Sequence, residues 1–393
     1  LSLVILVCFI YSSPSLASTI DIAELSPRTP GNVITLTETV NLTSFNVDGE
    51  WASMTGFKAR FESIWVNSSS DAFGVGGSGI IFHYDGSTWS SMTNSFAING
   101  TIVRLIDIWG SSGSDVFAVG TSGTIFHYDG SEWSAMSSGI TRELAGVWGA
   151  SSSDVYATGD NGIVLHYDGT NWNTVAGGTG GYGYGYNGLL QVITDSHFYD
   201  IWGSSSNDVF AVGGDGSILH YDGNSWSAMS SGTVRNLKSV WGSSSSDVFA
   251  VGDDGTILHY DGTSWTAMTT ASSTSPTFED IWGSSSSDVF AVGSQGSILH
   301  YDGTSWGAMS SDTAADLVSI WGSSGSDIFA VGTSEGAIIH NDGSSWTAMM
   351  DAFGTHFESV WVNSSSDAFA VGSSGIFHYD GSTWSSMTNS FAI

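Results

Sequence analysis

A unit of about 40 residues recurs eight times along this chain, and this repeat limits the possible folds more than any other feature of the sequence. Its clearest copy, LKSVWGSSSSDVFAVGDDGTILHYDGTSWTAM, runs from Leu237 to Met268. Each copy carries two tryptophans 23 to 25 residues apart and lacks the 3.6-residue apolar period of a helix. Four short strands fit such a unit, which is one blade of a propeller. We therefore predict an all-β fold, a β-propeller of eight four-stranded blades; the alternative is a seven-bladed ring with one duplicated or exchanged blade.

The four strands can be placed within the clearest copy. Clusters of Gly, Ser and Asp separate four segments, which are LKSVW, DVFAVG, GTILHYD and SWTAM. Apolar residues run without alternation from Val248 to Val251 in the second segment. Such a run predicts a strand covered on both faces, because each blade packs between two neighbours.

The order of these motifs, V-W, FAVG-x-x-G-x-I and DG-x-x-W, resembles that of bacterial secreted β-propeller repeat proteins of the BNR and photosystem II assembly-factor type. The resemblance covers residues 46 to 393 and implies the propeller fold. These families include enzymes, assembly factors and binding proteins, so the resemblance implies no single function. The chain departs from the sialidase pattern, whose Asp box has one more residue between Asp and Trp. The arginine cluster of a sialidase is also not suggested by the few arginines, which are Arg28, Arg60, Arg104, Arg142 and Arg235.

The tetrapeptide HYDG occurs in seven units, and HNDG replaces it in the eighth. The motifs begin at His83, His127, His166, His220, His259, His300, His340 and His378. A catalytic or metal site needs a few unlike residues that converge once, whereas this motif repeats around a ring. We therefore interpret it as structural, with Asp-Gly forming a tight turn between the third and fourth strands. The His, the aspartate equivalent to Asp247 and a strand Trp are expected to form a hydrogen-bond network under each blade.

Motifs of known enzymes are missing from the sequence. It contains no HExxH, CxxC, nucleophile elbow or P-loop. We therefore predict a protein that is not an enzyme, with no catalytic residue, no metal site and no cofactor.

Sixteen tryptophans occupy fixed positions in the repeat, and we expect them mainly to pack one blade against the next. Burying an aromatic side chain removes about 150–250 Å² from water, which is worth roughly 4–6 kcal/mol as an upper bound. The alternative for a subset of these rings is stacking on sugars, since a lectin would also repeat its aromatic platform.

The chain is strongly acidic. Its 38 Asp and Glu against 7 Lys and Arg give a formal net charge of −31. This charge would repel a phosphate backbone, so nucleic acid is excluded as a partner. We interpret the charge as a solvated surface, and the alternative is a cation-dependent role.

The first residues, LSLVILVCFIYSSPSLA, resemble a secretory signal with a cleavage site near Ala17. The apolar run is too short for an ordinary membrane-spanning helix. We therefore expect a secreted, extracellular or cell-surface protein that contacts a membrane only through this segment, if it is retained. The predicted organisation is a signal-like segment 1–17, an N-terminal extension 18–45, and a propeller 46–393 with an insertion at 176–197.

The insertion, AGGTGGYGYGYNGLLQVITDSH, is the largest break in the repeat. Tyr182, Tyr184 and Tyr186 alternate there with glycine, which predicts a loop with exposed rings that could bind glycans or a partner protein. The alternative is a tolerated surface insertion without function. A further departure is a valine, at Val66 and Val362, where the other units have glycine.

The N-terminal extension supplies strand-like segments that the repeat does not need. NVDGEWASM, which contains Trp51, repeats the end of a unit, although the last unit already has its own fourth strand. The stretch NVITLTETVNLTSF is also strand-like, and residues 61–98 and 357–393 are nearly identical. Because an unpaired strand edge exposes N–H and C=O groups, we predict homotypic contacts through this extension. The residues expected to make them are Trp51, Val33, Leu36, Val40 and Leu42.

Two classes of function follow from these features. The first is a non-catalytic structural or interaction scaffold outside the cell, whose partners are other copies of itself or other surface proteins. The alternative is a carbohydrate-binding, lectin-like propeller, whose partners are glycans.

Overall fold

The computed structural model describes residues 44–45, 52–53 and 60–387, except 93–96, 99–100, 178–181, 185–189, 193–195, 271–274, 312, 334–336 and 351–354. The chain divides into two compact units, Leu1–Phe57 and Lys58–Ile393. In the first unit, β1 (Ser44–Phe45) pairs antiparallel with β2 (Ala52–Ser53). The second unit carries the repeats.

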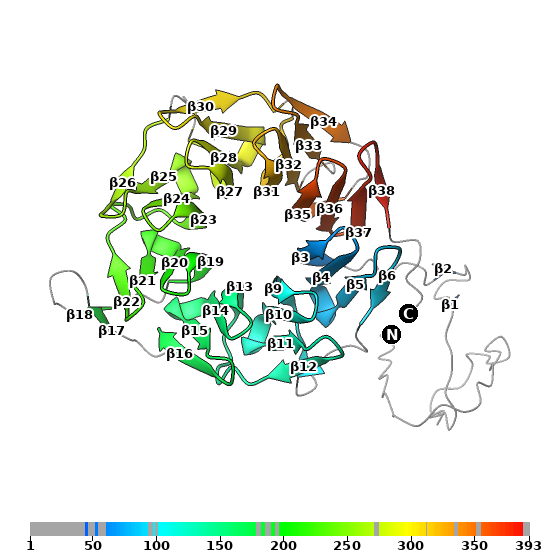
Figure 1. Ribbon diagram of the computed structural model, residues 1–393, viewed down its shortest axis with the longest axis horizontal. Coiled ribbons are helices and arrows are strands. Elements are labelled where there is room, and N and C mark those ends of the chain that lie inside the picture. The colour runs from blue at the N-terminus through cyan, green and yellow to red at the C-terminus, as the bar shows by residue number, and fades with distance from the viewer. Residues whose placement is uncertain are drawn as a thin grey trace, which may run out of the picture. The chain divides into compact units, whose positions relative to one another are not determined.

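The second unit is a ring of eight four-stranded antiparallel sheets, as predicted (Figure 1). In every sheet the strands follow one another in chain order from the axis of the ring to its rim. All eight units form blades, so the seven-bladed alternative is wrong.

The strands occupy equivalent positions from blade to blade. The inner strands are β3 (Phe61–Ser68), β9 (Leu105–Ser112), β13 (Leu144–Ser151), β19 (Phe198–Ser205), β23 (Leu237–Ser244), β27 (Phe278–Ser285), β31 (Leu317–Ser324) and β35 (Phe357–Ser364). The second strands are β4 (Asp71–Gly76), β10 (Asp115–Gly120), β14 (Asp154–Gly159), β20 (Asp208–Gly213), β24 (Asp247–Gly252), β28 (Asp288–Gly293), β32 (Asp327–Gly332) and β36 (Asp367–Gly372). The third strands are β5 (Ile81–Tyr84), β11 (Ile125–Tyr128), β15 (Val164–Tyr167), β21 (Ile218–Tyr221), β25 (Ile257–Tyr260), β29 (Ser297–Tyr301), β33 (Ile338–Asn341) and β37 (Gly375–Tyr379). The outer strands are β6 (Trp89–Ser91), β12 (Trp133–Met136), β16 (Trp172–Ala176), β22 (Trp226–Met229), β26 (Trp265–Ala267), β30 (Trp306–Met309), β34 (Trp346–Met350) and β38 (Trp384–Ser386).

The blade formed by β23–β26 shows how well the sequence placed the strands. Its second strand, β24, coincides with DVFAVG, and Val248 to Val251 are fully buried. The inner strand β23 continues through Gly242 to Ser244, beyond the predicted LKSVW. Burial on both faces follows from blade packing, as the continuous apolar run predicted.

The ring closes between β3 and β35 without exchanging a strand. The last blade uses its own outer strand, β38, which pairs with β37, as predicted. Phe61, Val66 and Phe82 of the first blade pack with Phe369 and Val371 of the last in one apolar cluster. Apolar packing therefore closes the ring at this junction.

The remaining described elements are short. The 3-10 turns between second and third strands are η2 (Gly77–Gly79), η3 (Thr121–Gly123), η4 (Asp160–Gly162), η5 (Gly214–Gly216), η6 (Asp253–Gly255) and η7 (Ser294–Gly296). Two small hairpins are β7 (Ala97–Ile98) with β8 (Thr101–Ile102), and β17 (Tyr182–Tyr184) with β18 (Leu190–Val192). Among the described residues no helix has the length and apolar character needed to cross a membrane.

The alternation of strand directions gives the ring two distinct faces. We name the turn face as the one that carries the turns from first to second strands and the Asp-Gly turns from third to fourth strands. The opposite face, named the loop face, carries the 3-10 turns and the connections between blades.

Candidate functional site

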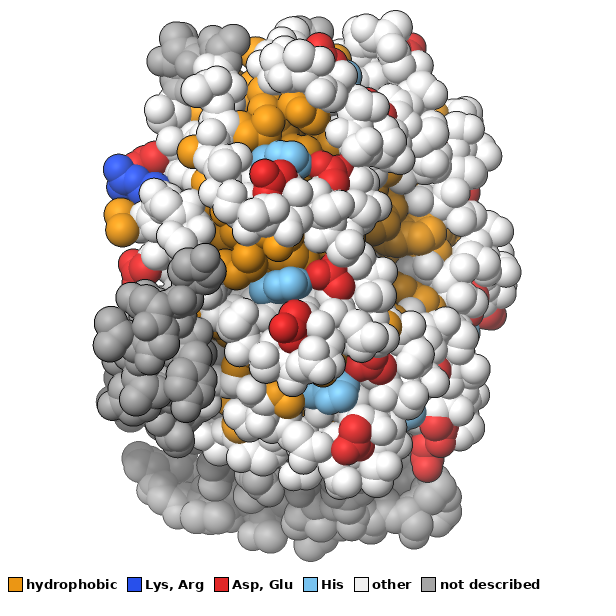
Figure 2. Space-filling view, turned by 60° about the vertical axis from the view of Figure 1, so that its left-hand side comes forward, with side chains coloured by type: hydrophobic (Ala, Val, Ile, Leu, Met, Phe, Trp, Pro, Cys, Tyr) orange, Lys and Arg blue, Asp and Glu red, His pale blue; other side chains and the backbone are white. Residues whose placement is uncertain are grey.

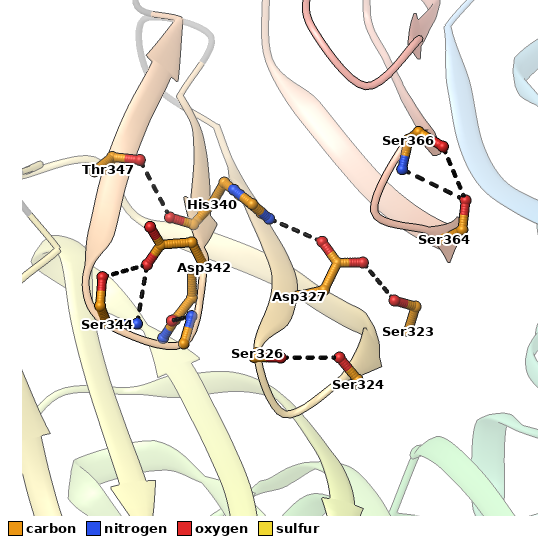
Figure 3. A network of polar contacts seen from close by, with 12 residues as sticks. Ser323, Ser324, Ser326, Asp327, His340, Asp342, Ser344, Thr347, Ser364 and Ser366 are labelled. Carbon is orange, nitrogen blue, oxygen red and sulfur yellow. Dashed lines mark hydrogen bonds and ion pairs between the residues drawn. The ribbon is translucent and has the colours of Figure 1, made fainter.

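The eight motif histidines all make the same contact, as their repetition predicted. Each Nε2 lies 2.7–2.9 Å from Oδ1 of the aspartate that begins the second strand of its own blade. In the blade of Figure 3, His340 contacts Asp327, which also accepts a hydrogen bond from the Ser323 hydroxyl. Each ring also lies 4.2–4.6 Å, centroid to centroid, from the Phe or Tyr of the second strand. The motif therefore connects the third strand to the second in every blade. No blade differs from the others in this contact.

The Asp-Gly turns also have the predicted form. In the turn at Asp261, Oδ1 accepts hydrogen bonds from the backbone N–H groups of Thr263 and Ser264, both at 2.9 Å. Gly262 has a φ of +86°, and a Cβ there would lie 2.8 Å from Cβ of Ser246. Glycine is therefore required both by the backbone conformation and by the close approach of the neighbouring turn.

The tryptophans of the outer strands pack between blades, as expected. Each indole meets the Phe or Tyr of the preceding blade's second strand edge-on, with centroids 5.7–6.3 Å apart. The expectation that a Trp joins the histidine network is wrong for these residues. The Nε1 of Trp133 faces the sulfur of Met92 at 3.4 Å, and that of Trp265 is buried without a hydrogen-bond partner. Apolar contact is therefore their main contribution.

Three aspartates of the inner strands bind the neighbouring blade. An inner strand has a free edge toward the axis, and its N–H groups need acceptors. A carboxylate of the preceding blade supplies one in three places, where Oδ2 accepts a backbone N–H at 2.9 Å. The pairs are Asp107 with Val147, Asp200 with Val240, and Asp280 with Ile320.

Two of these carboxylates share a serine. The hydroxyl of Ser239 lies 2.9 Å from Oδ2 of Asp200 and 2.9 Å from Oδ1 of Asp280. Burial raises the pKa of Asp280 to about 7, and the charge of Asp200 adds to the effect. Burial likewise raises the pKa of Asp200, and that of Asp107 to about 6. These groups therefore hold protons at a pH where exposed aspartates are ionised. No group of three or more potential metal-binding side chains occurs within the described part of the chain.

The tryptophans of the inner strands lie over glycines of the following blade. A Cβ added to any of six glycines would approach the six-membered ring of an indole to 2.5–2.7 Å, which is closer than real contacts allow. The pairs are Trp65 with Gly110, Trp109 with Gly149, Trp148 with Gly203, Trp202 with Gly242, Trp241 with Gly283, and Trp282 with Gly322. Glycine thus makes room for the indole at each of these junctions.

This arrangement fails at the two junctions where valine replaces glycine. Val362 and Val66 are buried, 3% and 4% exposed, and occupy the positions over which Trp321 and Trp361 would lie. Trp321 is 39% exposed, more than any other Phe, Tyr or Trp whose surroundings are described. Its ring lies 6.5 Å from that of Trp282 and 6.4 Å from that of Trp361, nearly parallel to the latter at 18°. We name these three residues the indole row; they lie on three successive blades.

None of the binding residues predicted from the sequence belongs to the indole row. Tyr182 and Tyr184 form β17, which lies beside the outer strand β22 at the rim (Figure 1). Tyr186 and the predicted assembly residues of the N-terminal extension, Trp51, Val33, Leu36, Val40 and Leu42, lie outside the described residues. The binding predictions for both groups stay predictions.

Comparison with known proteins supports the fold. Neither a protein-family model nor a curated protein matches the sequence. Among solved structures, the chain is similar to YCF48 bound to a D1 peptide, with 14% identity and a TM-score of 0.52 over 82% of this chain and 93% of that one. It is also similar to Chaetomium thermophilum Sqt1 bound to the N-terminus of ribosomal protein L10, with 14% identity and a TM-score of 0.66 over 83% and 98%. The C-terminal WD40 domain of Sif2 matches at 10% identity with a TM-score of 0.64 over 82% and 95%. These similarities show the propeller fold alone.

Proposed function

We propose that this chain is a non-catalytic interaction scaffold and that its partner docks around Trp321. The observation that carries this proposal is the exposed face of the Trp321 indole, which Val362 keeps out of the position held by the other inner tryptophans. Exposed aromatic rings are enriched where proteins bind partners, because they bury a large area with little loss of side-chain freedom. Trp321 also lies in the half of β31 that ends at the turn face, where a partner can approach along the axis.

Solved structures of the same fold favour a protein or peptide as the partner of this chain. YCF48 is seen with a D1 peptide, and Sqt1 with the N-terminus of L10. Both partners are segments of polypeptide. The indole row on the inner wall of this ring offers an aromatic surface on which such a segment can dock.

The decisive test compares two exposed apolar positions. Trp321→Leu removes the indole face, whereas Val234→Ser changes a valine that is 78% exposed in the connection before β23, on the loop face. Both variants are first shown to melt at the same temperature as the native protein. They are then screened against an array of peptides and glycans. We expect peptide ligands whose binding is lost with Trp321→Leu and kept with Val234→Ser. Ligands that bind both variants equally would contradict a role for the indole row.

The alternative is a carbohydrate-binding propeller. An exposed indole is also a stacking surface for sugars, so the same array separates the two functions. Glycans that bind only with Trp321 present would favour the lectin, and loss of glycan binding in Tyr184→Ala would move the site to the insertion.

We further propose that the protein acts outside the cell and associates with copies of itself through its N-terminal extension. The supporting observations are the signal-like first residues and the strand-like segments that precede the ring. Light scattering of residues 18–393 against residues 58–393 tests the association, which is expected only in the longer chain. Monomers in both cases would exclude it. Fractionation of cells expressing the full sequence tests export.

A further inference from the structure

We infer that the partner segment recognised by the indole row is cationic: an extended peptide with arginine or lysine side chains at alternate positions, one over Trp321 and the next over Trp361. This inference rests on the proposed function and names the chemistry of the partner. Three features of the ring lead to the charge of the partner, and the spacing of two indoles leads to its extended form.

The first feature is the kind of surface that Trp321 presents. The face of an indole carries negative charge density and attracts cations more strongly than other aromatic rings do. Trp321 belongs to none of the apolar clusters against which the other inner tryptophans pack, so its face is available, and Trp361 is only partly buried against one of them. A guanidinium or ammonium group can approach it without displacing a packed side chain.

The second feature is the charge of the turn face. Each Asp-Gly turn places one exposed aspartate there, eight in all, at Asp85, Asp129, Asp168, Asp222, Asp261, Asp302, Asp342 and Asp380. Hydrogen bonds from the turn lower the pKa of every one of them, to about 2 for Asp342. The eight carboxylates are therefore ionised at any physiological pH, and their summed field favours a cation approaching the turn face.

The third feature is the position of the basic residues. Those that the structure describes, Arg60, Arg104, Arg142, Arg235 and Lys238, all stand at or before the start of an inner strand, on the loop face. Most are already neutralised there by carboxylates, as Arg104 is by Glu62 at 2.8 Å and Arg60 by Glu358 at 3.0 Å. Figure 2 shows the same separation, with histidines and carboxylates recurring over the side in view and basic side chains only at its left edge. The described turn face thus has no lysine or arginine of its own to compete with a bound cation.

The spacing of the rings selects an extended chain. The centroids of Trp321 and Trp361 are 6.4 Å apart. Alternate side chains of an extended peptide point the same way and are separated by about 6.6 Å. Two cationic side chains two residues apart therefore match the two indoles. A neutral sugar would use the stacking surface but gain nothing from the eight aspartates.

The experiment measures binding of a fluorescein-labelled peptide of alternating arginine and glycine by anisotropy. The controls are the same peptide with glutamine for arginine, and the protein variants Trp321→Leu, Trp321→Phe and Val234→Ser at matched melting temperature. We expect the arginine peptide to bind the native protein and Val234→Ser alike, and Trp321→Leu at least fivefold more weakly, with Trp321→Phe between them. Binding should weaken further in about 1 M salt, where the screening length is about 3 Å.

Each remaining outcome overturns the inference in a recognisable way. Equal binding of the arginine peptide to Trp321→Leu would mean attraction by the aspartates alone. Equal binding of the glutamine peptide, lost in Trp321→Leu, would reject a cationic partner while leaving the docking at Trp321 intact. No binding of the arginine peptide to the native protein would also reject it, and the peptide and glycan array would then decide the proposed function by itself.

Discussion

Trp282 lies over Gly322, whereas Trp321, one blade further along the ring, meets a valine at Val362 and is left exposed. The two junctions are formed by equivalent inner strands, and the position under the indole is glycine in one and valine in the other. A Cβ at Gly322 would already come within 2.7 Å of the Trp282 ring, so a valine leaves no space for an indole in that orientation. Valine in place of glycine at this junction thus accompanies the exposure of Trp321, whereas Trp361, which meets Val66 at the next junction, stays partly buried against an apolar cluster.

The same displacement should be produced at another junction by Gly242→Ala. The added Cβ would lie 2.6 Å from the ring of Trp202, so the indole has to move away from it. Overpacking of this kind costs about 1–3 kcal/mol. We expect a lower free energy of unfolding in urea and greater quenching of tryptophan fluorescence by acrylamide.

Gly307→Ala is the matched control for that variant. Gly307 lies in the outer strand β30, and its nearest neighbour to an added Cβ is the carbonyl oxygen of His300 at 4.0 Å. Stability and quenching should stay at native values. If Gly242→Ala behaved as Gly307→Ala does, the indole would not need the space that glycine leaves.

The reverse change, Val362→Gly, should bury Trp321. Removing the valine side chain recreates the junction found at Gly322, over which an indole fits. The exchange of the Trp321 indole N–H with solvent, assigned by comparison with Trp321→Phe, is expected to slow. Unchanged exchange would show that something other than Val362 keeps the ring exposed.

The blades could be predicted from the sequence because their signals are local. The spacing of the tryptophan pair, the apolar run from Val248 to Val251 and the Asp-Gly turns all lie within one unit. The end of the inner strand was misplaced for a physical reason. Gly242 reads as the end of a strand, but its missing side chain instead admits Trp202 of the preceding blade. That contact joins residues 40 positions apart, and no pattern within one unit shows it.

The indole row was missed although its cause is visible in the sequence. Val66 and Val362 stand out where other units have glycine, but their effect depends on the indole of another blade. The three inner-strand aspartates were missed as well, because only closure of the ring brings Asp200 and Asp280 to the same serine.

The residues of the histidine network should contribute unequally to the free energy of unfolding. His259→Ala removes the partner of Asp247 and leaves a half-buried carboxylate, at an expected cost of about 1–3 kcal/mol. Ser243→Ala removes the other donor to Asp247 and should cost less than about 1 kcal/mol. The third blade already carries Ala150 at the position of that serine and keeps its histidine contact at 2.7 Å.

Urea unfolding of both variants measures these costs. His259→Gln can still donate a hydrogen bond to Asp247 and should recover part of the loss. Equal costs for Ser243→Ala and His259→Ala would show that the histidine has no special place in the network.

The buried carboxylates at the axis should make the protein more stable in mild acid. An aspartate of the unfolded chain releases its proton near pH 4, whereas the pKa of Asp280 in the folded protein is raised to about 7. Between these values the folded state holds a proton that the unfolded state has lost, so protonation favours folding. The contribution is fully present below about pH 4 and is lost as the pH rises through 7. Asp107 and Asp200, whose pKa values are also raised, act in the same direction.

Melting temperatures measured between pH 5 and pH 8 test this dependence. The native protein is expected to melt at a higher temperature at pH 5, and Asp280→Asn, which is neutral throughout, should melt above it at pH 8 and show a flatter profile. Asp261→Asn is the control, because turn hydrogen bonds lower the pKa of that exposed carboxylate. The carboxylate therefore makes the stability depend on pH only below about pH 4. Its melting temperature should therefore shift by the same amount at pH 5 and pH 8. A profile for Asp280→Asn as steep as the native one would show that the carboxylate of Asp280 is ionised in the folded ring at neutral pH, in spite of its burial beside Asp200.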